Sequence, residues 1–310
     1  MQSISINPFR LLSESWRFLL KQPALLSVLF WLLIAPAVLL DMVRLYWPES
    51  DIESVRRIGT TGFIVAQVVL AFLFFWGFAS VLLVGRRMVK SMAGRSRTSF
   101  RSVRRESLRM IFPLFFTSLL RAIVTLEWAF LAAIPAMMFL LGSQTCRATV
   151  SPFISAFGTF VNTGTIGFLD PVLRKIPMRC GPLLIALPLL LPAAVYQIRT
   201  AFFGVIVVSE NLLYRDALRR SRDIVRGRTW SVLMTILVMA VSLYAPSVIL
   251  SFAVGALLQT ASPDAVLFGA VAKDIVYAVA TLLFILALTA FYGKLRREAG
   301  RVEEVVPEME

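Results

Sequence analysis

The 310-residue chain contains no histidine and only two cysteines. Without histidine, it lacks the usual base of a serine nucleophile, the usual proton relay near neutral pH and a common zinc ligand. Two thiols alone do not make a zinc site. No nucleophile–base pair and no paired carboxylates occur at positions that the pattern brings within reach of each other. We therefore expect no cofactor, no metal and no enzymatic activity.

Acidic residues are also few, 18 against 32 lysines and arginines, so the net charge is +14. In a soluble chain this charge would suggest nucleic acid, but no recognition module accompanies it. The chain is 58% hydrophobic with a mean hydropathy of +0.79, and several apolar runs exceed the roughly 18–20 residues that span a bilayer. Basic blocks beside such runs are better explained by membrane topology and anionic lipid headgroups. We expect membrane lipids, and not nucleic acid, as partners; a protein partner stays unidentified.

Six apolar runs are long enough to cross a bilayer: about 22–43, 61–84, 110–141, 182–208, 230–256 and 265–292. They predict an all-α integral membrane fold of six transmembrane helices in three hairpins. We expect one membrane domain over 1–300 and an acidic tail over 301–310. The start of the chain is too long and too amphipathic to head a cleavable signal peptide, so the first run predicts a retained membrane helix. The basic linkers before the third and fifth runs predict that both termini lie in the cytoplasm.

Each of the first, third and fifth runs follows an arginine-rich segment with apolar residues at helical spacing. The segments are Pro8–Lys21, Ser99–Phe112 and Leu213–Trp230. In the third, one side of the helix carries Leu213, Ala217, Ser221 and Ile224, and another side carries Arg215, Arg219, Arg222 and Arg226. This pattern predicts a cytoplasmic amphipathic helix that lies on the membrane surface before each of these spans.

The three segments can be aligned on a shared serine. Alignment on Ser15, Ser107 and Ser221 puts Leu11, Val103 and Ala217 in register, and also Phe18, Met110 and Ile224. Two interpretations stay open. In the first, the segments are copies of one structural unit. In the second, they acquired similar patterns independently, as amphipathic membrane helices do.

Residues 196–230 carry a resemblance to a known family. A Tyr and an Arg in an apolar helix precede a Glu, then an Ala-Leu-x-x-Ser run and an Arg-Gly-Arg-x-Trp run. The matching positions are Tyr196, Arg199, Glu210, Ala217, Leu218, Ser221, Arg226, Gly227, Arg228 and Trp230. This stretch resembles the membrane domain associated with glycerophosphoryl diester phosphodiesterases and related uncharacterised six-helix bacterial membrane proteins. The resemblance implies a membrane module of poorly defined role. It does not imply the hydrolase, whose catalytic domain needs histidines that this chain lacks.

The same stretch predicts a corner between a surface helix and a membrane helix. Gly227 suits the left-handed conformation that ends a helix, and Trp230 suits the level of the lipid headgroups. Glu210 lies within reach of the arginines that follow it. Two interpretations stay open: a structural corner with lipid anchors and no ligand, or an anion or docking site on the cytoplasmic face.

Five charged residues fall inside the apolar runs: Arg121, Glu127, Arg199, Lys273 and Asp274. A charge at the membrane centre costs about 2.5–3.5 kcal/mol on insertion scales, so such groups find partners or face water. We predict that Glu127 pairs with Arg199 on a neighbouring helix, and that Lys273 and Asp274 lie near the outer interface. The charges then either fix helix packing, line a polar transport path, or stand at the interface by chance.

Cys146 and Cys180 flank the longest segment predicted to lie outside the membrane. An oxidising compartment permits a disulfide between them, which contributes roughly 3–4 kcal/mol if it closes this loop. Two independent apolar thiols are the alternative. The interior of the loop is apolar enough for an interfacial or re-entrant helix.

Together these features favour a non-enzymatic polytopic inner-membrane protein. Its role would lie in envelope organisation, regulation, or contact with lipids or a protein partner. The alternative is a small-molecule or lipid permease that uses the intramembrane charges.

Overall fold

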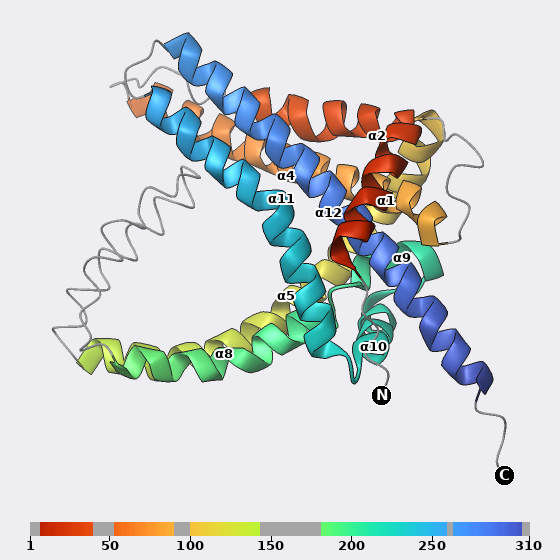
Figure 1. The fold of residues 1–310 in the computed structure, drawn as a ribbon. Helices are drawn as coiled ribbons and strands as arrows, with labels where there is room; N and C mark the ends of the chain where they lie inside the picture. The colour runs from red at the N-terminus through yellow and green to blue at the C-terminus, as the bar shows by residue number, and fades with distance from the viewer. Residues whose placement is uncertain (1–6, 40–52, 90–99, 143–180, 259–262, 306–310) are drawn as a thin grey trace. The chain divides into compact units, whose positions relative to one another are not determined.

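The computed structural model describes residues 7–39, 53–89, 100–142, 181–258 and 263–305 (Figure 1). These residues are helical and contain no strand. The chain forms two compact units. One comprises Met1–Leu119 and Arg199–Glu310, and the other comprises Leu120–Ile198.

The helices of the first unit are α1 (Pro8–Lys21), α2 (Pro23–Val28), the π-helical turn η1 (Leu29–Ile34), α4 (Glu53–Val89), α9 (Phe203–Glu210), α10 (Tyr214–Val225), α11 (Thr229–Leu258) and α12 (Pro263–Val305). Helix α5 (Phe100–Gly142) begins in this unit and ends in the second. Helix α8 (Gly181–Arg199) belongs to the second unit up to its last residue.

Among the described residues, five helical stretches are long and apolar enough to cross a membrane: Val68–Arg86, Arg101–Trp128, Leu190–Glu210, Thr229–Leu250 and Val271–Glu298. A sixth is counted if α1 and the following Pro23–Leu39, which meet at 89°, form one broken span. For the described residues, the prediction of an all-α fold is therefore confirmed, with five or, counting the broken pair, six of the predicted membrane-crossing helices.

Helix α12 is the centre of the first unit. It contacts α1, η1, α4, α10 and α11, and 61% of its span is buried, compared with 22% for α11. Two glycines let it approach α4 closely. A Cβ on Gly293 would lie 3.2 Å from the Cα of Val89, and one on Gly85 would lie 3.1 Å from the Cγ2 of Thr289. Leu282, Leu286 and Tyr292 of α12 are completely buried.

The second arginine-rich segment differs from the expectation of a separate surface helix. It is continuous with the apolar run that follows, because α5 extends without a break from Phe100 to Gly142. The first segment is separated from its run by Gln22 and Pro23, and the third by Arg226–Arg228. The reason lies in the sequence: the second segment holds no proline or glycine up to Phe112, and Pro113 is accommodated inside the helix.

The predicted run 182–208 also differs, since it is interrupted. Helix α8 ends at Arg199, Thr200–Phe202 form a turn, and α9 begins at Phe203. At the other end of the chain, α12 continues to Val305, so the first residues of the predicted tail are helical.

Candidate functional site

The aligned positions of the three arginine-rich segments occupy the same buried side of their helices. Ser15, Ser107 and Ser221 are completely buried. The apolar residues in register with them are also buried, with Met110 partly so: Leu11, Val103, Ala217, Phe18 and Ile224. A shared buried side is what a repeated unit requires. It also means that these apolar faces pack on protein.

Each aligned serine forms hydrogen bonds. The Ser15 hydroxyl donates to the carbonyl of Leu11 at 2.8 Å, one turn back along α1. The Ser107 hydroxyl accepts from the indole N–H of Trp76 on α4 at 2.9 Å. Ser221 of α10 makes the most consequential contacts, because its partners lie in the interruption between α8 and α9.

The hydroxyl of Ser221 bridges this interruption. It donates to the carbonyl of Arg199 at 2.9 Å and accepts from the backbone N–H of Phe202 at 3.3 Å. A break in an apolar helix frees backbone groups that lipid does not solvate, and a serine hydroxyl is one of the few groups that satisfies both a donor and an acceptor. Helix α10 therefore stabilises the interruption as well as covering it.

The opposite side of α10 is basic and exposed. Arg215, Arg219 and Arg222 recur every three or four residues and continue into Arg226, so they form one stripe. All four are exposed, and none forms an ion pair with a residue that the structure describes. Leu213, predicted on the apolar side, precedes the helix and is 39% exposed. Below, the basic stripe means these four arginines.

The chain leaves α10 through Gly227, whose φ of +78° is left-handed, as the sequence predicts. Trp230, two residues into α11, is 71% exposed. Helix α10 also begins from an unusual backbone, since Tyr214 has a φ of +48°. The Tyr214 N–H donates to the buried hydroxyl of Thr117 on α5 at 3.2 Å, a contact that the sequence does not reveal.

Glu210, the last residue of α9, joins three helices. Its Oε1 accepts from the Tyr292 hydroxyl at 2.6 Å and lies 3.2 Å from the Nε of Arg296, both on α12. Its Oε2 lies 3.5 Å from the Nε of Arg220 on α10. The side chain of Glu210 is only 12% exposed. The predicted proximity of Glu210 to the arginines that follow it is therefore observed at Arg220, and two further partners come from α12.

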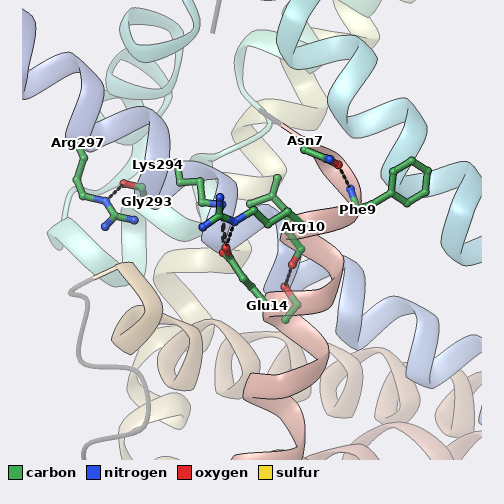
Figure 2. A network of polar contacts seen from close by, with 9 residues as sticks. Asn7, Phe9, Arg10, Glu14, Gly293, Lys294 and Arg297 are labelled. Carbon is green, nitrogen blue, oxygen red and sulfur yellow. Dashed lines mark hydrogen bonds and ion pairs between the residues drawn. The ribbon is translucent and has the colours of Figure 1, made fainter. Parts of the chain in front are cut away.

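Two more ion pairs hold the same segment of α12. Lys294 lies 3.1 Å from Glu14 of α1 (Figure 2), and Glu298 lies 3.2 Å from Arg228, just before α11. We call Tyr292, Lys294, Arg296 and Glu298, with their partners Glu14, Glu210, Arg220 and Arg228, the polar collar. The sequence does not reveal the polar collar, because the partners of these α12 residues are far away in the chain.

The predicted intramembrane charges have different surroundings. Arg121 donates to the backbone carbonyl of Gln197 at 3.1 Å, and the Gln197 amide donates to the Thr125 hydroxyl at 2.8 Å. These three residues form a polar cluster inside the second unit. Glu127 and Arg199 are exposed and belong to different units, so their pairing stays a prediction.

The remaining predicted residues add little to a site. Lys273 and Asp274 are partly buried in α12. Cys146, Cys180 and the loop between them lie outside the described residues. Within the described part of the chain, no three Cys, Asp or Glu side chains gather closely enough to hold a metal ion. The arrangement is therefore suited to electrostatic contact between the basic stripe and an anionic partner, while the ion pairs of the polar collar connect the helices to one another.

The Ser221 bridge generates a direct test. We expect Ser221→Ala to lower the free energy of unfolding by about 1–3 kcal/mol, because the buried N–H of Phe202 and the partly buried carbonyl of Arg199 lose their partner. Ser209→Ala is the matched control, since Ser209 is also buried but its hydroxyl has no hydrogen-bond partner. Unfolding in mixed micelles measures both. Equal effects of the two substitutions would show that the bridge does not stabilise the interruption.

Comparisons of the chain with family models, with curated proteins and with solved structures find no match. The resemblance of residues 196–230 to a phosphodiesterase-associated membrane domain thus stays an expectation from the sequence.

Proposed function

We propose that the protein is a non-enzymatic, multi-pass protein of the bacterial inner membrane that binds anionic lipid headgroups through the basic stripe of α10. This contact would give it a part in organising or regulating the envelope. The single observation that carries the proposal is that α10 has one buried side and one exposed, basic side. Ala217, Leu218, Ser221, Ile224 and Val225 are buried, while the four arginines are exposed.

The chemistry of the stripe favours phosphate. Guanidinium groups bind phosphate oxygens in a planar, bidentate manner. Arginines near a leaflet rich in anionic lipid contribute about 1 kcal/mol each to association. Helix α10 is packed against α9 and α12 through its buried residues, and Arg220 pairs with Glu210, so the stripe lies on a helix that the fold holds in place. Asp216 and Asp223 flank it and limit its net charge.

The proposed topology has six spans in three hairpins with both termini in the cytoplasm. Two observations support it. The ion pair between Glu14 and Lys294 brings the first helix and the end of the last helix together. Arg228 and Glu298 add a contact between the start of α11 and that same end. Basic segments gathered at one end of a bundle favour the cytoplasmic side.

A second candidate function is a permease for a small molecule or lipid. The specific observation in its favour is the cluster of Arg121, Gln197 and Thr125 within apolar helices, since charged residues in spans often mark substrate paths. Contacts to a backbone carbonyl and a hydroxyl serve a structural role equally well, so this candidate ranks below lipid binding.

The proposed lipid contact predicts a change in lipid selectivity. Replacing all four arginines of the basic stripe by glutamine should lower the preference of the reconstituted full-length protein for anionic over zwitterionic lipid several-fold. Spin-labelled lipids in vesicles of mixed composition measure this preference. The matched control replaces the same arginines by lysine, which keeps the charge and should retain most of the preference. An unchanged preference in the glutamine variant would contradict the proposal.

A variant of Arg121 separates lipid binding from transport. We expect Arg121→Gln to lower protein stability by about 1–3 kcal/mol, because the partly buried carbonyl of Gln197 loses a charged donor, and to leave solute flux per molecule unchanged. Arg109→Gln, exposed on the same helix, is the control. Uptake and efflux are compared at equal protein abundance. A selective change in flux in the Arg121 variant would favour the permease.

A further inference from the structure

Helix α1 carries three parallel rows of residues. Phe9, Trp16 and Leu20 are separated by seven and four residues, close to two turns and one turn, so they lie on one stripe. These side chains are 62%, 46% and 62% exposed. We call them the apolar row. Its exposure is unexpected for large hydrophobic residues on a helix that already packs against the bundle.

The next two rows repeat the same spacing, one and two residues later. The first is cationic, with Arg10, Arg17 and Lys21, all exposed. The second is buried, with Leu11, Phe18 and Gln22 at 0%, 4% and 1% exposure. Successive rows are about 100° apart around the helix. The helix therefore presents protein-facing, cationic and exposed apolar sides in turn.

Among the described residues, one ion pair involves the cationic row. Arg10 lies 3.1 Å from Glu14, which also binds Lys294 (Figure 2). Arg17 and Lys21 form no ion pair with any residue in the described ranges. A pair of exposed cations beside exposed Phe, Trp and Leu is the combination that suits the boundary between headgroups and acyl chains.

The orientation of α1 provides an independent argument. Pro23 begins the next helix, and the axes of Pro8–Lys21 and Pro23–Leu39 meet at 89°. If the apolar Pro23–Leu39 crosses the bilayer, α1 lies parallel to its surface. An in-plane helix at the interface contacts acyl chains on its membrane side, and headgroups and water on its other uncovered sides.

Helix α10 differs in this respect. Its exposed surface consists of the basic stripe with Asp216 and Asp223, and its only large exposed hydrophobic side chain is Tyr214, at the first residue. It therefore has the charge for a headgroup contact but no apolar row to insert. The aligned segments share a buried side and differ in what they expose.

We propose that α1 is embedded in the boundary between headgroups and acyl chains. Phe9, Trp16 and Leu20 contact acyl chains, and Arg17 and Lys21 contact lipid phosphates. Helix α10 remains outside the apolar layer and contacts lipid by charge alone. The inference rests on the proposed membrane-surface function, but it assigns a different kind of contact to a different helix. Insertion of α1 depends on apolar burial, so it persists at high salt and in lipid without net charge.

The test measures the depth of single positions in the full-length protein. In a background with Cys146→Ser and Cys180→Ser, one cysteine is introduced by Leu20→Cys or by Arg219→Cys and labelled with an environment-sensitive fluorophore. Both positions are exposed, so neither substitution disturbs the core. The labelled proteins are reconstituted in vesicles of zwitterionic lipid, with and without lipids brominated on the acyl chains.

We expect brominated lipid to quench the label at position 20 strongly, and iodide in the aqueous phase to quench it several-fold less than the label at 219. These differences should not change between low salt and 0.5 M salt. Equal access of iodide to both positions would overturn the inference. So would a label at 20 that is shielded from iodide yet unaffected by brominated lipid, since a second copy of the chain then covers the row.

The failure of this proposal is distinguishable from failure of the proposed function. Insertion of α1 is measured in zwitterionic lipid, where the basic stripe has no anionic partner. Loss of anionic selectivity in the stripe variant is measured in mixed lipid with α1 unchanged. Either result can be obtained without the other.

Discussion

Glu210 is the group on which the rest of the first unit depends. A carboxylate that is only 12% exposed, at the end of an apolar helix, is stable only if its charge is compensated. Its compensation comes from Arg220 on α10 and from Tyr292 and Arg296 on α12. The consecutive helices α9 and α10 are thereby fixed to α12, which lies much later in the chain. Glu14 and Lys294 extend the same principle to α1, and Arg228 and Glu298 extend it to α11.

This arrangement explains what the amphipathic helices expose. Because α1 and α10 pack their regular apolar sides against the bundle, those sides are not available to lipid. What remains outside is the basic stripe on α10 and, on α1, a cationic row beside Phe9, Trp16 and Leu20. The polar collar thus sets the positions of two surfaces that differ in chemistry. The proposed lipid contacts follow from this difference, since one surface offers charge alone and the other offers charge with apolar area.

Part of the fold could be predicted from the sequence because it follows local rules. Apolar runs predicted about six potential spans, and Gly227 predicted a left-handed turn. Helical spacing predicted which side of each arginine-rich segment is apolar, but that side was expected to face lipid and instead packs on protein. The uninterrupted α5 could also have been inferred, because its basic segment contains no helix breaker. The interruption at Thr200–Phe202 could not, since these residues include no proline or glycine and the hydroxyl that stabilises the interruption belongs to Ser221. Arg121 was expected to find a partner or to face water, but a backbone carbonyl as its acceptor leaves no trace in the residue pattern. The collar was missed for the same reason: Glu14 and Lys294 lie at opposite ends of the chain.

A double-mutant cycle on Glu210 and Arg296 tests the role of the collar most directly. The free energy of unfolding in mixed micelles is measured for Glu210→Gln, for Arg296→Gln and for the double variant. Because Arg296 is 46% exposed, solvent weakens the pair, and we predict a coupling energy of about 1 kcal/mol. The control cycle joins Glu210→Gln with Arg219→Gln, an exposed arginine of the basic stripe, and should show additivity. Additive effects in both cycles would contradict the view that ion pairs to α12 hold this unit together.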